Sequence, residues 1–203
     1  TLYATKRARP DTCTAIAFLT TRVRAPDKDD WNKLTHLMKY LRGTRILPLI
    51  LSANGTGILK WWVDAAFAVH PNMRGHSGGG LSLGRGFPIV SSTKQKLNTR
   101  SSTEAEIVGA HDFMPAICWT RYFMEAQGYQ VQDNILFQDN KSAILLEKNG
   151  KASSSKRTKH VNIRYFFITD RVDKGDVSLI WCLTGDMIRD FMTKPLQGAL
   201  FQK

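Results

Sequence analysis

Apolar residues follow a helical period near the start of the chain. They recur at intervals of three and four over residues 11–24 and again over 29–42. In the second segment one stripe is formed by Trp31, Leu34, Met38 and Leu41. Asp29 or Asp30 is in position to cap the start of this helix, and Gly43 stands just beyond its end. The pattern predicts two short helices.

Further along, apolar and polar residues alternate, which is typical of half-buried strands. Such strands are predicted over residues 58–69, 75–84 and 87–96. Asp64 falls late in the first of them. An apolar run at 46–53 is also strand-like, and Pro48 favours a sheet edge there. The turn residues that follow this run mark a domain boundary, and the short connections after it predict three antiparallel strands.

The second half of the chain alternates between helical and strand patterns. Ser101 and Glu104 form a capping-box pattern, which predicts a long helix from about Ser102 that Pro115 kinks or breaks in two. Helices are further predicted over 140–150, 161–175 and 186–196, and strands over 134–139 and 176–184. Residues 151–159 are basic and serine-rich and are expected to form a loop. The resulting element order is βββαβααβα.

The charge of the chain favours a polyanionic partner. Lys and Arg total 29 against 17 Asp and Glu, which gives a formal net charge of +12. Residues 1–60 hold 11 basic and 4 acidic side chains, so the first third is the more basic part. A solvated basic face would have the same composition, and charge alone does not separate this alternative from nucleic-acid binding.

The cysteine pattern predicts neither a disulfide framework nor a zinc site, because Cys13, Cys118 and Cys182 are far apart and form no C-x-x-C pair. No segment resembles a signal peptide, and no apolar run reaches the roughly 20 residues that span a bilayer. These features predict a soluble, intracellular protein with no membrane association. The first residues are not preceded by Met, which suggests a piece of a longer polyprotein.

Four carboxylates stand at the ends of predicted strands or in the first turns of predicted helices. They are Asp64, Glu106, Asp139 and Asp190. Hydrolysis of a phosphodiester by two metal ions needs ligands that hold the ions roughly 3.5–4 Å apart, and Mg²⁺ prefers oxygen ligands. Sites in open α/β sheets gather at the carboxyl ends of strands. Each acid alone is more commonly a turn or cap residue, but together they predict a two-metal nuclease centre.

Two of these choices exclude a neighbouring acid. Glu104 and Glu106 are two residues apart on one helix and point in nearly opposite directions, so only one can face the sheet. Glu104 is explained as the capping-box partner of Ser101, which leaves Glu106 for the centre. In the last helix Asp186 is in the N-cap position, whereas Asp190 is one turn further and can face inward.

Five motifs occur between about Ile58 and Leu196 in a specific order: WWVDAAF, SSTEAEIVGA, LFQDNKSAI, SKRTKHVNIRYFFI and MIRDFMTKPL. They resemble the ribonuclease H domain of copia-type LTR retrotransposon polyproteins. The preceding RPDTCTAIAFLTTR and DWNKLTHLMKYLRGT resemble the end of the reverse transcriptase in the same polyprotein, its thumb and connection. The resemblance implies a reverse transcriptase-like segment at 1–56 and a ribonuclease H domain at 57–203.

The fold implied by this resemblance is an α/β, ribonuclease H-like fold. Its mixed five-stranded sheet has three antiparallel strands followed by parallel strands and is flanked by helices, and a small helical segment precedes it. The resemblance implies that Asp64 bridges two Mg²⁺ ions, with Mn²⁺ as an alternative. It further implies that Asp190 completes the site of the nucleophilic water and that Glu106 and Asp139 hold the other ion.

The activity implied is hydrolysis of the RNA strand of an RNA–DNA hybrid during retrotransposon reverse transcription. The implied partners are the hybrid and the reverse transcriptase part of the polyprotein, inside a cytoplasmic virus-like particle or the nucleus. A non-catalytic module that holds the hybrid for the polymerase is the main alternative. A transposase or integrase of the same fold is less favoured, because a Glu between the first and second Asp is typical of ribonucleases H. The oligomeric state is left open.

Several polar residues are candidates for contact with the nucleic acid. They are Ser77, Thr103, Asn140, Lys156, Arg157, Lys159 and His160. Each has an equally ordinary role in a turn, a cap, a solvated loop or the protein interior. Ser92 is a further candidate with the same ordinary alternatives. His70 and His76 lack zinc-site spacing and are expected at the surface, and of Trp61 and Trp62 at least one is expected in the core while the other is free to stack on a base.

Overall fold

The computed structural model describes residues 2–150, 162–183 and 190–193 of the 203-residue chain. Its helices are α1 (Leu2–Arg7), a 3-10 turn (Pro10–Thr12), α2 (Cys13–Thr20), α3 (Lys28–Gly43), α4 (Ser102–Ala126), α5 (Lys141–Asn149), α6 (Asn162–Asp173) and α7 (Asp190–Thr193). Its strands are β1 (Ser52–Ala53), β2 (Ile58–Ala66), β3 (His76–Ser82), β4 (Gly84–Arg85), β5 (Ile89–Lys94), β6 (Asp133–Gln138) and β7 (Ser178–Trp181).

Five of these strands form one mixed sheet in the order β5-β3-β2-β6-β7. The pairs β5–β3 and β3–β2 are antiparallel, whereas β2–β6 and β6–β7 are parallel. The sheet expected from the sequence, with three antiparallel strands followed by parallel ones, is therefore confirmed. β1 and β4 form a separate two-stranded pair, which ties the chain before β2 to the end of β3.

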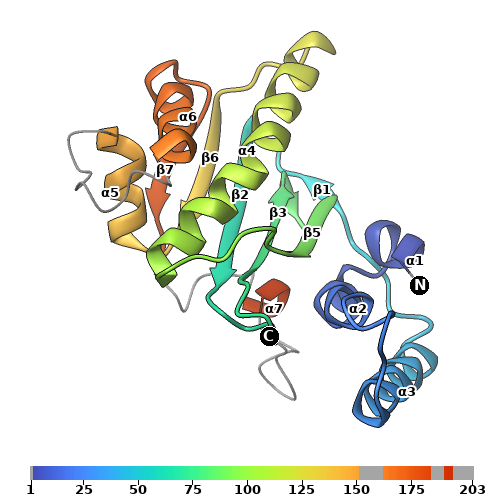
Figure 1. Cartoon of the computed structure of the whole chain (residues 1–203). Coiled ribbons are helices and arrows are strands. Elements are labelled where there is room, and N and C mark those ends of the chain that lie inside the picture. The colour runs from blue at the N-terminus through green and yellow to red at the C-terminus, as the bar shows by residue number, and fades with distance from the viewer. Residues whose placement is uncertain (1, 151–161, 184–189, 194–203) are drawn as a thin grey trace.

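The helices α4, α5 and α6 lie together on one face of this sheet (Figure 1). α4 packs on β2 and β3, with α5 and α6 beside it. α7 lies on the opposite face, as two neighbouring glycines of β3 show. A Cβ atom at Gly79 would meet Phe113 of α4, and one at Gly78 would meet Met192 of α7. The main core lies between α4 and the sheet and includes Trp61, Val63, Ile107, Met114 and Leu136.

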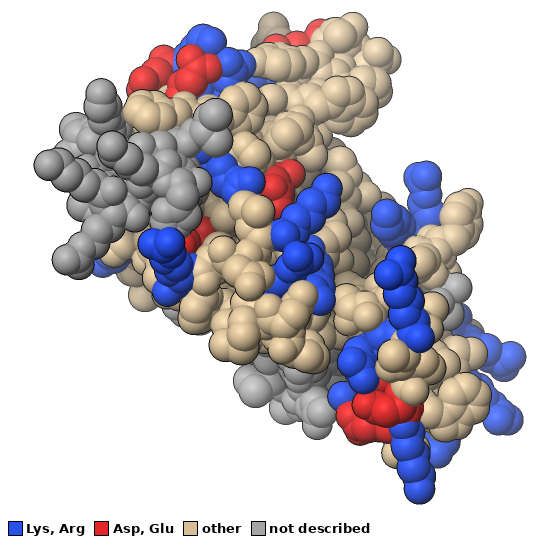
Figure 2. Space-filling view, viewed as in Figure 1, with Lys and Arg blue, Asp and Glu red and all other residues tan. Residues whose placement is uncertain are grey.

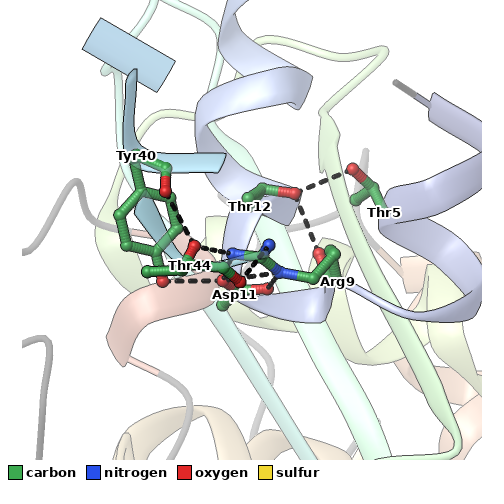
Figure 3. Close-up of polar contacts among 6 residues, drawn as sticks. All are labelled: Thr5, Arg9, Asp11, Thr12, Tyr40 and Thr44. Atoms are coloured by element: carbon green, nitrogen blue, oxygen red, sulfur yellow. Dashed lines mark hydrogen bonds and ion pairs between the residues drawn. The ribbon is translucent and has the colours of Figure 1, made fainter. Parts of the chain in front are cut away.

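The N-terminal helices form a segment of their own, which lies beside β5 in Figure 1. Its centre is the Asp11 carboxylate, which accepts hydrogen bonds from Arg9 Nη2 and from the Tyr40 hydroxyl, each at 2.7 Å (Figure 3). Arg9 Nη2 also donates to Thr44 Oγ1 at 2.7 Å. These contacts join the turn before α2 to the end of α3, so a small set of polar groups holds the segment together.

Several expectations for this first part of the chain are wrong. α3 is capped by Asp27, not by Asp29 or Asp30. The Asp27 side chain accepts a hydrogen bond from Asp30 N, and the side chain of Asp30, the third helical residue, accepts one from Asp27 N. In the expected apolar stripe Trp31 and Met38 are exposed, at 68% and 51%, and Leu34 and Leu41 are half-buried, while Leu37, outside the stripe, is buried. The short helix α1 was not expected at all.

The expected strand at 46–53 is also mostly absent. Only Ser52–Ala53 pairs, with β4, while the rest of the run has no strand structure and is largely exposed. Pro48 has no N–H to give to a ladder, and no core lies against this linker. The apolar run therefore resembles a strand in composition without having a sheet to join.

Three further expectations are corrected in the second part. Pro115 neither splits α4 nor ends it, since the helix runs without interruption through it. Pro115 is exposed, so water can satisfy the carbonyl that loses its partner. His70 and His76 are buried and not on the surface. Trp61 and Trp62 are both buried, and Trp62 stacks on Phe137 with ring centroids 5.1 Å apart, so neither is available to a base.

Candidate functional site

The two central strands bring two of the predicted acids together. β2 and β6 are parallel neighbours in which Trp62 pairs with Phe137. Two residues further along each strand lie Asp64, still within β2, and Asp139, directly after β6. Because parallel strands run in step, the two carboxylates come to the same edge of the sheet.

The third acid reaches the same place from the first turns of α4. Ser101 caps this helix by accepting from Glu104 N at 3.2 Å, and the Glu104 carboxylate accepts from Arg100 N at 2.7 Å. Glu104 is therefore a residue of the helix start, as its spacing from Ser101 predicted. Glu106 is 5% exposed, and its Oε1 accepts from Ala65 N at 3.2 Å, which fixes the carboxylate beside Asp64.

The three carboxylates form a cluster of oxygen ligands, here called the acidic cluster: Asp64, Glu106 and Asp139. One carboxylate oxygen of each lies within 4.8 Å of those of the other two. Asp64 and Glu106 are buried and Asp139 is half-buried, so one side of the cluster is open to solvent. Carboxylate oxygens converging from three elements are a donor set that suits a hard divalent cation such as Mg²⁺.

The fourth predicted acid, Asp190, is the first residue of α7, and its side chain lies outside the described residues, as does Asp186. The helix itself reaches the acidic cluster. Thr193 Oγ1 donates a hydrogen bond to Asp64 Oδ2, and both residues are buried. The backbone of α7 thus lies against the strand that carries the first acid.

The candidate nucleic-acid contacts divide into three groups. Ser77 is buried and its hydroxyl accepts from Gln95 Nε2 at 2.8 Å, so we leave it out of the proposed contact surface, and Ser92 is buried as well. Thr103 and Asn140 are half-buried near the cluster, where Asn140 caps α5 and its Nδ2 approaches Thr103 Oγ1 at 3.4 Å. The basic residues Lys156, Arg157 and Lys159, together with His160, lie outside the described residues.

Two residues next to the cluster were missed. Trp181 at the end of β7 donates from its indole Nε1 to the Asp139 carbonyl at 3.1 Å. Lys141 Nζ stands 4.2 Å from the centre of the Trp181 ring. The Trp181 hydrogen bond ties the end of β7 to the turn after β6, and the Lys141 ammonium lies over the Trp181 ring. A signal was available, because the strand predicted at 176–184 runs parallel to the one that ends at Asp139.

Basic side chains are spread over the visible face of the molecule and are dense on the N-terminal helices (Figure 2). That segment carries most of the positive excess of the first third of the chain. Among the described helices, none has both the length and the apolar character needed to cross a bilayer.

No protein-family model matches the chain. It is similar in sequence to the retrovirus-related Pol polyprotein from transposon TNT 1-94 of Nicotiana tabacum, with 30% identity over 99% of the chain. The retrovirus-related Pol polyprotein from transposon RE2 of Arabidopsis thaliana is 31% identical over 96% of the chain. The chain spans only 15% and 13% of the length of these two relatives.

Solved structures resemble the chain at much lower identity. A foamy viral protease-reverse transcriptase in complex with double-stranded DNA matches 90% of this chain and 30% of its own, with a TM-score of 0.53 and 12% identity. Ribonuclease H1 from the archaeon Halobacterium salinarum matches 63% of this chain and 87% of its own, with a TM-score of 0.43 and 14% identity. At 12% identity the likeness to the foamy viral chain concerns the fold alone.

Proposed function

Since this chain is homologous to one segment of the retrovirus-related Pol polyproteins of copia-type transposons and has a ribonuclease H-like fold, we propose that it hydrolyses the RNA strand of RNA–DNA hybrids during reverse transcription. The observation that carries the proposal is the convergence of Asp64, Glu106 and Asp139 at one edge of the sheet. Three acids from separate elements repel one another unless a cation lies between them, so their approach favours a metal-dependent role.

The acidic cluster, completed by Asp190, is the proposed holder of two divalent ions. When bound, such ions supply a nucleophile from water near neutral pH and neutralise charge at the leaving oxygen. The protein's own part is to hold the carboxylates in place. Ala65 N fixes Glu106, and Thr193 Oγ1 fixes Asp64. The indole of Trp181 fixes the turn that presents Asp139.

The proposed substrate lies across the open side of the cluster. Phosphate contacts supply most of the affinity for a nucleic acid, and the 2′-hydroxyl distinguishes RNA from DNA. Thr103 and Asn140 border the cluster and offer hydroxyl and amide groups, and Lys141 offers a cation. We extend the surface to Lys156, Arg157, Lys159 and His160 on the strength of the sequence. The remaining polyprotein, including the reverse transcriptase, is the proposed partner, within a virus-like particle or the nucleus.

The test is a cleavage assay in Mg²⁺ with three labelled substrates. They are an RNA–DNA hybrid with the label on the RNA strand, the same RNA as a single strand, and a DNA duplex. We expect cuts within the hybrid only, and none after chelation of the metal. Asp64→Asn, Glu106→Gln and Asp139→Asn should each abolish cutting while hybrid affinity stays nearly unchanged, because phosphate contacts carry most of the binding.

Two exposed acids provide matched controls. Glu125→Gln removes a carboxylate at the far end of α4, and Asp173→Asn removes one at the end of α6. Both variants should cut the hybrid like the unmodified protein. If the unmodified protein binds the hybrid tightly in Mg²⁺ and leaves the RNA intact, the non-catalytic binding module replaces the nuclease.

A further inference from the structure

α7 is seated on the sheet more closely than side chains normally allow. A Cβ atom at Gly78 of β3 would lie 2.6 Å from the carbonyl oxygen of Met192 and 2.7 Å from its Cβ. Met192 is fully buried, and Thr193 next to it donates to Asp64. The glycine in β3 therefore allows the backbone of α7 to lie directly on the strand. Because Asp190 is the first residue of α7, the position of this helix sets the position of the Asp190 backbone.

A buried chain of hydrogen bonds ends on the same helix. Ser92 Oγ lies 2.8 Å from the carbonyl oxygen of Met192, and His76 Nε2 lies 2.7 Å from Ser92 Oγ. His70 Nε2 lies 3.0 Å from His76 Nδ1. All of Ser92, His76 and His70 are buried, so these bonds are shielded from water.

The direction of each bond follows from the last acceptor. A carbonyl oxygen can only accept, so the Ser92 hydroxyl gives its proton to Met192 and must itself accept from His76 Nε2–H. His76 Nδ1 is then an acceptor, and the proton in that bond comes from His70 Nε2. Burial lowers the pKa of His76 to about 4, with the neighbouring His70 as a second cause. A neutral His76 is the form that this direction requires.

The far end of the chain is covered by the N-terminal segment. The Phe18 ring of α2 stacks on His70 and on His76, with centroids 4.7 and 4.5 Å apart and interplanar angles of 20° and 21°. α2 also packs against β5 and α7. A side chain from the N-terminal segment thus holds the two imidazoles in the orientation from which the hydrogen bonds run to α7.

We propose that His76 and Ser92 are positioning residues that hold α7, and with it Asp190, against Asp64, and that Phe18 couples the N-terminal segment to this arrangement. The inference rests on the proposed function, because it assigns Asp190 to the metal centre. It gives the N-terminal segment a specific task, which is to keep the last acid in register with the acidic cluster.

The test compares Ser92→Ala, which removes the donor to Met192, with Ser92→Thr, which keeps a hydroxyl. Positioning groups around metal ligands are typically worth about 10–100-fold in metal affinity or activity. Ser92→Ala should therefore lower kcat by about 10-fold or more and raise the Mg²⁺ concentration for half-maximal rate. KM for the hybrid should stay unchanged, and Ser92→Thr should recover most of kcat. Thr93→Ala, an exposed neighbour on β5, is the control.

A second pair of variants acts from the N-terminal segment. Phe18→Ala removes the stacked ring, and Phe18→Tyr keeps it. We expect the same split as for Ser92→Ala, with kcat reduced and KM for the hybrid unchanged, and recovery in Phe18→Tyr. Full activity in both Ser92→Ala and Phe18→Ala would overturn the proposal. Equal losses in Ser92→Ala and Ser92→Thr would overturn it as well, since the hydroxyl would then not matter.

A readout without catalysis separates this inference from the proposed function. In the metal-free protein, amide hydrogen exchange in α7 should be about fivefold or more faster in Ser92→Ala than in the unmodified protein, because a net hydrogen bond is lost. Unmodified protein that does not cut the hybrid would refute the nuclease and leave this measurement standing. Unchanged exchange in α7 would refute the positioning role even in an active nuclease.

Discussion

The acids of the N-terminal segment and those of the acidic cluster have opposite surroundings. Asp11 faces the Arg9 guanidinium and the Tyr40 hydroxyl, and Asp30 faces Arg22. Burial alone would raise the pKa of Asp11, but the hydrogen bonds from Arg9 and Tyr40 outweigh it and hold the pKa below its ordinary value. In the acidic cluster three carboxylates instead face one another within 4.8 Å.

This difference separates acids that are paired with cationic or hydroxyl groups of the fold from acids for which we propose a metal-binding role. Hydrogen bonds from a guanidinium stabilise the ionised carboxylate in the folded state, and this adds to the free energy of unfolding. Carboxylates that approach one another raise the free energy of the folded state until a cation joins them. Removing a charge should therefore have contrasting effects on stability and activity in the two regions.

The largest expected effect is on cleavage by the acidic cluster. Asp139→Asn should reduce the rate of hybrid cleavage by about 10³-fold or more, because a lost metal ligand removes roughly 4 kcal/mol of transition-state stabilisation. Its free energy of unfolding without metal should be unchanged or higher, since one of the repelling charges is gone. A single-turnover assay and a urea titration measure the two quantities. A variant that cuts normally, or that unfolds much more easily, would erase the contrast between the regions.

Glu147 of α5 sharpens the comparison as a third kind of acid. It is fully buried, and its Oε1 accepts from Gln138 Nε2 at 3.4 Å. Burial raises its pKa to about 8, with the hydrogen bond from Gln138 acting in the opposite direction. Between its unfolded value near 4.5 and about 8, the folded state holds a proton that the unfolded state has lost, so stability should fall as pH rises through this range.

The measurement is the free energy of unfolding against pH for the unmodified protein and Glu147→Gln. We expect the unmodified protein to lose a few kcal/mol relative to the variant between pH 5 and 8. His76 acts in the opposite sense, because its pKa is lowered from 6.5 to about 4 in the folded state. Its contribution to the free energy of unfolding therefore falls as the pH drops from 6.5 towards 4. It is present in both proteins and cancels in their difference. Parallel curves would show that Glu147 does not titrate as inferred.

Asp11→Asn should give a smaller effect, confined to stability. In the variant a neutral amide replaces the carboxylate that accepts hydrogen bonds from Arg9 and Tyr40. The free energy of unfolding should fall by about 2 kcal/mol, because hydrogen bonds to a charged group are the stronger ones. Cleavage at 25 °C should be unchanged. Asp29→Asn is the control, because the exposed pair of Asp29 with Lys33 should contribute well under about 1 kcal/mol. Equal effects of the two substitutions would mean that burial of the Arg9–Asp11 pair does not matter.

The smallest expected effect is stabilisation by metal. Mg²⁺ at about ten times its dissociation constant should add about 1.4 kcal/mol to the unfolding free energy, which raises Tm by about 3–5 °C in a chain of this size. A variant with Asp64→Asn, Glu106→Gln and Asp139→Asn combined should show no shift, while Asp11→Asn should respond like the unmodified protein. A shift that survives in the triple variant would place the metal elsewhere.

Sequence reasoning succeeded where the signal was local and periodic. Alternation over residues 58–69 located β2 and placed Asp64 near its end, and a short apolar run before Asp139 located β6. The pattern at Ser101 correctly gave Glu104 to the helix start, although the Glu104 carboxylate accepts from Arg100 N and not from Ser101 N. These patterns repeat within a few residues, so each could be read without knowledge of distant partners.

It failed where the partners lie far apart in the chain. The Phe18 ring, 58 residues before His76, stacks on this buried imidazole, and no spacing near His76 indicates that contact. In α3 several acids fall within one turn, so the pattern could not select Asp27 as the cap. The close approach of α7 to Gly78 likewise could not be inferred, because Met192 lies more than a hundred residues further along the chain.

The most direct test of the account is a crystal structure grown in Mn²⁺, with anomalous difference maps to locate the ions. We predict a peak bonded to oxygen atoms of Asp64, Glu106 and Asp139, and a second peak beside Asp64 that is also bonded to Asp190. Absence of any peak in the acidic cluster, at a Mn²⁺ concentration that saturates hybrid cleavage in solution, would contradict the account.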